Sequence, residues 1–133
     1  MLKEKWLQEA IKLAQDNETS KNGSPFGAVV VKDGVIVGRG VNQVKRTHDP
    51  SQHAELQAVI HACQSLQTTD LTGCEIYAST EPCPMCLSAI YFTKIDAVYF
   101  AEISTESQDY VYHQLSLPRQ ERDIHMEQLL EKN

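Results

Sequence analysis

The sequence predicts an α/β fold in which a mixed β-sheet lies between helices. Residues 28–31 and 35–41 are apolar runs rich in β-branched side chains, and the Lys-Asp-Gly turn between them predicts an antiparallel hairpin. A strand at 75–79, a helix at 83–93 and a strand at 97–100 then form a strand–helix–strand unit. Such a unit implies parallel pairing with a right-handed connection, so both kinds of pairing are expected in one sheet.

Length and composition indicate one globular domain covering residues 1–133. A chain with 41% hydrophobic and 23% charged residues has the balance of an ordinary globular protein and is long enough for a core. No apolar run approaches the roughly eighteen residues needed to cross a bilayer, and no secretory leader is evident, so we expect a cytoplasmic protein without membrane contacts. The four cysteines fit a reducing compartment, and Cys63 and Cys74 are expected to be buried thiols without chemistry.

The N-terminal segment is predicted to be an amphipathic helix over residues 2–16. Leu7, Ala10 and Ala14 recur at helical spacing on one face. Trp6 lies beside this face and is interpreted as a core anchor.

Two further helices are expected in the middle of the chain. An Asp-Pro-Ser start signal at 49–51 combines a capping side chain with a proline suited to a first helical turn. The helix at 83–93 is apolar around much of its circumference, Phe92 included, and is expected to be mostly buried. The predicted buried stripe of the earlier helix consists of Leu56, Val59, Ile60 and Cys63.

Two motifs supply metal-binding and acid–base groups. His53 and Glu55 flank an alanine, and Cys83 and Cys86 belong to a Pro-Cys-Pro-Met-Cys run. His53, Cys83 and Cys86 are predicted to bind Zn²⁺ and to leave its fourth position for water, because tetrahedral zinc with three protein ligands is usually catalytic. Zinc lowers the pKa of bound water from about 15.7 towards roughly 7. Glu55 is predicted to accept that proton and pass it to a leaving group.

The spacing within each motif predicts where the metal lies. Cys83 and Cys86 are three residues apart and share one face of a helix, whose N-terminus lowers a cysteine pKa. His53 and Glu55 would point about 200° apart on a regular helix, so they reach one metal only if it lies off the helix end. We therefore expect regular helix to begin near His53 and the zinc to lie between two helix N-termini.

Other interpretations of these residues are open. A lone Cys-x-x-Cys can be a redox pair or half of a structural zinc site. Neither a thioredoxin-like order of elements nor a second Cys-x-x-Cys or His pair is evident in the sequence. If the zinc were structural and the chain a binding module, a fourth protein ligand such as His48 or Asp49 would be needed.

The motifs together resemble the signature of the zinc-dependent cytidine/deoxycytidylate deaminase superfamily. The Ser-Pro-Phe-Gly-Ala run at 24–28, Asn42, and the segments 49–55 and 81–86 are similar to those of bacterial guanine deaminases and their nucleoside deaminase relatives. The similarity runs over about residues 3–126. It implies a three-layer α-β-α fold with a mixed sheet.

The resemblance also implies roles for individual residues. Backbone amides beside the metal ligands, here those of Ala54 and Cys83, would bind the substrate or the developing oxygen. Asn42 would contact the base edge, Phe26 would form part of the pocket wall, and Asp109 would contact the purine. For Asn42, Phe26 and Asp109 the alternatives are ordinary roles at a strand exit, in the core and at a helix start.

The expected reaction is hydrolytic deamination of a nucleobase or nucleoside, with guanine, converted to xanthine and ammonia in purine metabolism, as the favoured substrate. A tRNA adenosine deaminase and a cytosine deaminase are the alternatives. A net charge of −6 without a visible Lys/Arg cluster disfavours nucleic acid as a partner.

The C-terminal part is predicted as a polar loop at 102–109 and a helical or partly extended tail at 118–133. In guanine deaminases the tail helps close the active site, in some cases across a dimer. The resemblance therefore implies a homodimer.

Overall fold

The structure is a computed structural model that describes residues 2–104 and 108–130. Its strands are β1 (Gly27–Lys32), β2 (Val35–Val41), β3 (Cys74–Thr80) and β4 (Ala97–Glu102). They form one sheet in the order β2-β1-β3-β4. β1 pairs antiparallel with β2 and β3, whereas β3 and β4 are parallel. The predicted hairpin and the mixed sheet are therefore confirmed.

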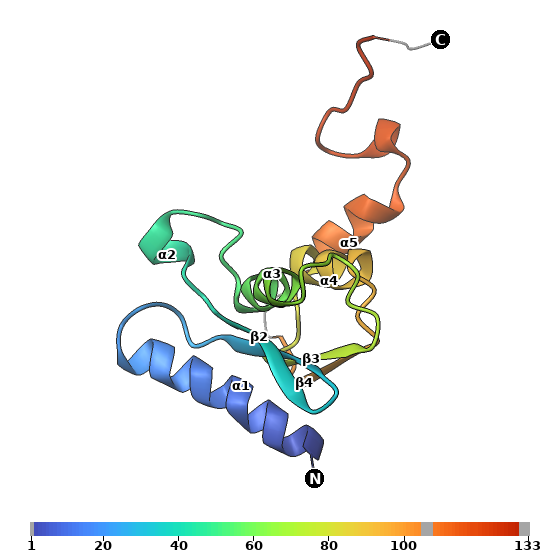
Figure 1. Ribbon diagram of the computed structural model, residues 1–133. Coiled ribbons are helices and arrows are strands. Elements are labelled where there is room, and N and C mark those ends of the chain that lie inside the picture. The colour runs from blue at the N-terminus through green and yellow to red at the C-terminus, as the bar shows by residue number, and fades with distance from the viewer. Residues whose placement is uncertain (1, 105–107, 131–133) are drawn as a thin grey trace.

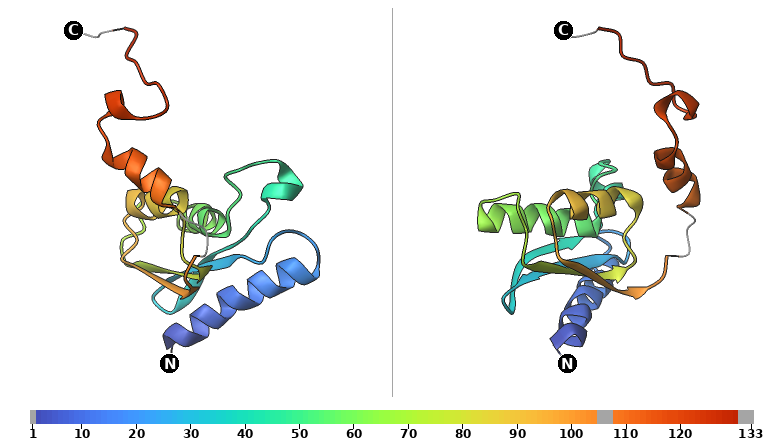
Figure 2. Two further views of the ribbon diagram at one scale, coloured as in Figure 1. Left: turned by 180° about the vertical axis from the view of Figure 1, so that it is seen from behind. Right: turned by 90° about the vertical axis from the view of Figure 1, so that its right-hand side faces the viewer.

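Helices cover both faces of this sheet (Figures 1 and 2). α1 (Leu2–Thr19) lies on one face, and α3 (Ala54–Leu66) and α4 (Pro84–Phe92) lie on the other. This is the three-layer α-β-α arrangement that the resemblance implies. The other helical elements are α2 (Val44–Thr47), which the sequence pattern does not predict, α5 (Asp109–Ser116) and a 3-10 turn at Arg119–Glu121.

Alternate residues of β1 contribute to the cores on the two faces of the sheet. Val29 and Val31 pack with Trp6 and Tyr77 on the α1 side, whereas Val30 belongs to the core beneath α3 and α4. This alternation is the two-residue period of a strand that is buried on both faces. Trp6 is buried, so its interpretation as a core anchor is confirmed.

Small residues, not the predicted stripe, bring α3 against β2. An added Cβ at Gly38 or Gly40 would lie 2.3 Å or 2.1 Å from a carbonyl oxygen of α3. Of the predicted stripe only Val59 is buried, and Ile60 is exposed. Cys63 is partly buried and packs against the core, so the stripe was wrong at Ile60 and missed the innermost face. The glycines of β2 let the helix backbone approach the strand directly, which turns an alanine face inwards. That face consists of Ala54, Ala58 and Ala62.

Replacing Gly40 with alanine is expected to destabilise the protein. The new methyl group would lie 2.1 Å from the Ala54 oxygen and 2.6 Å from the Ala58 nitrogen, both backbone atoms. Overpacking of this kind costs about 1–3 kcal/mol, measured by denaturant unfolding. Arg39→Ala, on an exposed residue of the same strand, is the control and should change the free energy of unfolding by less than about 0.5 kcal/mol. Equal stability of Gly40→Ala and the wild type would contradict this packing.

α4 is less buried than predicted. Cys86 and Ile90 are buried, but Tyr91 and Phe92 are 76% and 85% exposed. The expectation of a mostly buried helix is therefore wrong for the outward face of α4. This helix lies in an outer layer, with the sheet on one side and no further layer of the described chain covering the other (Figure 1).

The chain beyond β4 leads away from the sheet (Figure 1). Tyr110, Leu115 and Leu129 are exposed along it. After the 3-10 turn, residues 122–130 form neither helix nor strand, in agreement with a partly extended tail. The predicted 102–109 loop and the end of the tail fall in part outside the described residues. None of the described helices is long and apolar enough to cross a membrane.

Candidate active site

Two of the predicted metal ligands stand at the N-termini of helices. His53 is the N-cap residue of α3 and Cys83 is the N-cap residue of α4, and both have an extended backbone. Pro84 follows as the first residue of α4, a position where the missing N–H of proline has no helical partner in any case. The predicted start of regular helix near His53 is confirmed, and the two ligand residues lie at neighbouring helix ends.

The 49–51 start signal does not cap a helix as expected. Asp49 Oδ1 accepts hydrogen bonds from the Ser51 amide at 2.9 Å and from the Ser51 hydroxyl at 2.6 Å. Asp49 Oδ2 accepts one from Gln52 at 3.2 Å. These bonds stabilise a turn before α3, which begins only at Ala54. Asp49 can make the same local hydrogen bonds in a turn as at a helix start, so the sequence pattern does not separate the two.

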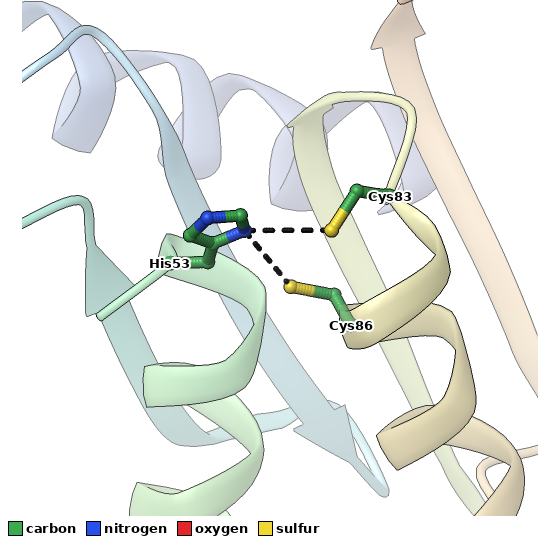
Figure 3. A group of neighbouring side chains, drawn as sticks. All are labelled: His53, Cys83 and Cys86. Atoms are coloured by element: carbon green, nitrogen blue, oxygen red, sulfur yellow. Dashed lines mark hydrogen bonds between the residues drawn. The ribbon is translucent and has the colours of Figure 1, made fainter. Parts of the chain in front are cut away.

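The three predicted zinc ligands converge (Figure 3). His53 Nδ1 lies 3.4 Å from Cys83 Sγ and 3.5 Å from Cys86 Sγ. All three ligand atoms lie within 4.8 Å of one another. A tetrahedral zinc with Zn–S bonds of roughly 2.3 Å and a Zn–N bond of roughly 2.0 Å would hold sulfur and nitrogen about 3.5 Å apart. The donor set therefore fits Zn²⁺, with Nδ1 as the ligating nitrogen of the imidazole.

No fourth His, Cys, Asp or Glu joins this group in the part of the chain that the structure describes. His48 is exposed at the end of α2, and the Asp49 carboxylate is hydrogen-bonded to Ser51 and Gln52. Neither residue therefore supports a closed, structural site. A set of three ligands leaves a position for water, as in catalytic zinc sites.

The two thiols of the group have opposite pKa shifts. Hydrogen bonding with Cys86 lowers the pKa of the Cys83 thiol to about 5, and the nearby His53 acts in the same direction. The shared hydrogen bond and burial raise the pKa of Cys86. The lowering at Cys83 was predicted from its place at a helix N-terminus, but its largest cause is the neighbouring thiol. Because metal ligation needs thiolates, binding of a cation releases the remaining proton.

Glu55 is buried beside the ligand group. Its side chain is 8% exposed and lines the same cavity as His53 and Cys83. Burial is the main cause that raises the pKa of its carboxyl to about 7, and the charge of Cys83 adds to the shift. A carboxyl with a pKa near neutral pH can both accept and donate a proton during catalysis.

A cavity of about 490 Å³ opens in front of Glu55 and the ligand group. Small-molecule sites typically measure about 300–1,000 Å³. Segments far apart in the sequence line it: the loop before β1, the residues after β2, the ends of β3 and β4, and the residue before α5. This cavity is called the inner cavity below. Among its lining residues are Phe26, Asn42, Lys45, Glu81, Glu102 and Gln108.

Asn17 connects two walls of the inner cavity through hydrogen bonds, a role that the sequence pattern did not reveal. It is only 4% exposed, and its Nδ2 donates to the main-chain oxygens of Ser24 and Asn42, both at 2.9 Å. Those oxygens belong to the loop before β1 and to the residue after β2. The signal in the sequence was an amide three residues beyond Ala14, on the buried face of α1.

Asn17→Asp is expected to destabilise this wall. The carboxylate cannot donate to the two carbonyl oxygens, and a buried group without its partner costs about 1–3 kcal/mol, more when it is charged. The free energy of unfolding should fall by about 3 kcal/mol at neutral pH, measured by denaturant titration. Asn22→Asp makes the same change on an exposed residue of the adjacent loop. Equal losses in the two variants would show that the Asn17 hydrogen bonds do not carry the effect.

The residues that the resemblance assigns to the substrate lie in different places. Asn42 and Phe26 line the inner cavity. Ala54 is the first residue of α3 and its side chain is fully buried, so it can offer a ligand only its backbone. Asp109 is the first residue of α5, and its neighbour Gln108 lines the cavity although Asp109 itself does not.

Comparison with known proteins places the chain in a family. Residues 1–102, which include the three ligands and Glu55, match the cytidine and deoxycytidylate deaminase zinc-binding region. The chain belongs to this family. It is a zinc-dependent deaminase, and the fold and the metal that the resemblance implied are confirmed.

Individual relatives show how far the likeness of this deaminase extends. Guanine deaminase of Bacillus subtilis is 40% identical over 127 residues, which cover 91% of this chain and 81% of the relative. A tRNA-specific adenosine deaminase of Aquifex aeolicus is 39% identical over 103 residues, 77% of this chain and 68% of the relative. The X-ray structure of the Bacillus subtilis guanine deaminase matches with a TM-score of 0.88 at 39% identity, over 96% of this chain and 85% of that one. A variant of the protein NE0047 in complex with 8-azaguanine matches with a TM-score of 0.73 at 29% identity, over 84% and 62% of the two chains.

Proposed function

We propose that this deaminase hydrolyses the amino group of a purine, guanine foremost, to give xanthine and ammonia. One observation carries the proposal: the ligand atoms of His53, Cys83 and Cys86 converge beside the buried carboxyl of Glu55 at one cavity. The 40% identity to a guanine deaminase and the likeness to a protein bound to 8-azaguanine support a purine substrate. An enzyme of this kind would act in purine metabolism in the cytoplasm.

Proton transfer is the proposed task of Glu55. His53, Cys83 and Cys86 would hold Zn²⁺, which would supply Lewis-acid activation of a water molecule. Glu55 accepts a proton from this water and passes it to a ring nitrogen. It then takes the second proton, from the hydroxyl group now on the ring carbon, and passes that one to the departing amino group. The water oxygen stays on the ring carbon and the amino group leaves as ammonia, so atoms and protons balance. In the metal-free site burial raises the pKa of Glu55 to about 7, and the positive charge of a bound zinc ion would lower it from there.

Four further residues are proposed to hold the base. Asn42 Oδ1 already accepts a backbone hydrogen bond at 3.2 Å, which leaves its Nδ2 to donate to an acceptor on the base edge. Phe26 presents an aromatic ring to the flat base. The Ala54 amide, in the first turn of α3, lacks a partner within the helix and is proposed to bind the developing oxygen. Asp109 follows the cavity-lining Gln108, and on the family resemblance it is proposed to accept a hydrogen bond from a purine N–H.

A tRNA adenosine deaminase is the second candidate, favoured by the 39% identity to such an enzyme. The net charge of −6 opposes it, since a long RNA backbone needs cationic contacts. Ammonia release separates the candidates. Zinc-loaded protein is assayed with guanine, adenine, cytosine, their nucleosides and a tRNA anticodon hairpin. Guanine turnover with equimolar xanthine supports the proposal, whereas turnover confined to the hairpin or to cytosine would replace it.

We also propose that residues 1–133 form one domain and that two copies associate as a homodimer. The packing of α1, α3 and α4 on one sheet supports a single domain. Monomeric proteins rarely expose large contiguous apolar patches, and two-fold symmetric dimers are the commonest oligomers. The exposed apolar residues of α4 and α5 include Met85, Tyr91, Phe92, Tyr112 and Leu115.

Tyr91→Glu combined with Phe92→Glu is expected to convert the dimer to monomers, because charges in an apolar interface lose hydration without gaining partners. The mass by light scattering should fall from about 30 kDa to the 15.0 kDa of one chain. Val35→Glu, which changes an exposed apolar residue at the start of β2, is the control and should leave the dimer intact. A wild-type protein that is monomeric at micromolar concentration would contradict the proposed association.

A further inference from the structure

A second hollow adjoins the inner cavity. It measures about 530 Å³, lies between the loop after α1 and the short helix α2, and is called the outer pocket below. Ser24, Pro25 and Lys45 line both hollows, so the two adjoin at these residues. A ligand longer than a base in the inner cavity would therefore have the outer pocket beside it.

The outer pocket is cationic, unlike the rest of the chain. Three cations against one acid, Glu18, give it a formal charge of +2. The inner cavity has three glutamates against one lysine. Residue 21 lies far from residues 45–46 in the sequence and joins them only in the fold. The three cations are Lys21, Lys45 and Arg46.

The cationic side chains of the outer pocket and two of its backbone N–H groups have no partner among the residues that the structure describes. In the ranges 2–104 and 108–130, no carboxylate lies within 4 Å of any of the three cations. The backbone N–H groups of Gly23 and Ser24 also have no acceptor there. Asn17 holds the Ser24 end of the loop in place, so the N–H groups of Gly23 and Ser24 lie on a fixed stretch of backbone.

We propose that the outer pocket binds the phosphate of a nucleoside monophosphate whose base lies in the inner cavity. This inference rests on the proposed function and specifies the form of the purine that the enzyme takes. Lysine and arginine form charge-assisted hydrogen bonds with phosphate oxygens, and free backbone N–H groups in a loop add to an anion site. The donor-bearing base matches the acidic inner cavity, and the phosphate matches the cationic outer pocket.

Volume and charge distinguish this ligand from a free base and from a long RNA. A cavity of about 490 Å³ is large enough for a drug-sized ligand, so a single base fills only part of it. The chain has a net charge of −6 and the outer pocket a formal charge of +2, so the remaining residues together have a charge of −8. A second or third backbone phosphate would meet this negative surface, whereas a single phosphate would not.

The test compares guanine, guanosine and GMP with zinc-loaded protein at low ionic strength. The kcat/KM for GMP is expected to exceed that for guanosine by about tenfold, the effect of one charge-assisted contact. Lys21→Glu combined with Arg46→Glu should remove this advantage. The same variant should leave kcat/KM for guanine within about twofold, because neither residue lines the inner cavity. Raising the salt from about 50 mM to about 500 mM should also reduce the GMP advantage.

Lys12→Glu combined with Lys94→Glu is the matched control. It makes the same change in net charge at two residues that line neither hollow, and it should keep the preference for GMP. Equal kcat/KM for guanosine and GMP would overturn the inference while guanine deamination stands, as would a GMP preference that survives charge reversal in the outer pocket. Turnover of an RNA hairpin without turnover of GMP would overturn it too.

Binding of inorganic phosphate gives a readout that does not need activity. Calorimetric titration should detect phosphate binding to the wild type and to the Lys12/Lys94 control, and at least about tenfold weaker binding to the Lys21/Arg46 variant. If no base or nucleotide is deaminated, the proposed function fails, and this titration still decides the phosphate site. Equal phosphate affinity in all three proteins would overturn the site.

Discussion

Replacing Glu55 with glutamine is expected to lower kcat by about a thousandfold, within the range of about 10²–10⁴ for general acid–base catalysis. The amide has nearly the size of the carboxyl but cannot take a proton from water. Zinc content should stay at one ion per chain, because Glu55 is not one of the three ligand residues. Ammonia release and elemental analysis of the same preparation measure both quantities.

Glu81→Gln is the control for this variant. Glu81 lines the same cavity but is exposed, so its loss should lower kcat by less than about tenfold. Burial disfavours the ionised form of Glu55, so the neutral amide should not lower the melting temperature. A zinc-loaded Glu55→Gln protein with wild-type turnover would remove Glu55 from the mechanism. Equal reductions of kcat in Glu55→Gln and Glu81→Gln would mean that Glu55 is not the specific proton carrier.

Cys86→Ala is expected to abolish zinc binding, and with it all measurable turnover. Cys86 is fully buried, and its Sγ lies 3.5 Å from His53 Nδ1. Two protein ligands cannot hold the ion against chelators, and the binding free energy of a metal is also folding free energy. The melting temperature of the variant should therefore match that of wild-type protein treated with a chelator, and added zinc should not raise it.

Cys74→Ala provides the matched control, since Cys74 is also fully buried but lies outside the ligand group. It should keep one zinc per chain and wild-type turnover, and should lose only about 1 kcal/mol of stability to the small cavity that it leaves. Stoichiometric zinc in purified Cys86→Ala, retained after dialysis against a chelator, would show that this thiol is not a ligand.

The parts of the site that depend on short stretches of sequence were predicted well. The start of α3 at Ala54 follows because His53 and Glu55 can face one metal only if it lies off the end of a helix. The start of α4 at Pro84 follows because proline suits the first turn of a helix. The hairpin likewise follows from local chemistry. Asp33 and Gly34 adopt φ angles of 52° and 74°, the conformation of a two-residue type I′ turn.

The predictions that failed concern which face of a helix meets which neighbour. The buried face of α3 is set by the small residues around Gly40, and the exposure of Phe92 by the absence of another described layer over α4. Hydrophobic periodicity reports how apolar a face is, but it does not report how closely a neighbouring backbone approaches. The prediction that Asp49 caps a helix failed for a related reason, because the same side chain can stabilise a turn or cap a helix.

By itself the sequence determined the four strands, the three helices that cover the sheet, the zinc ligands and the acid beside them, because local spacing dictates which side chains a strand end or a helix N-terminus presents. Only the tertiary structure decided how Asn17 joins two cavity walls and how Lys21 meets Lys45 and Arg46 in one pocket. These groups come from segments separated by a strand hairpin. Their proximity therefore results from packing against the sheet, and no periodic pattern in the sequence indicates it.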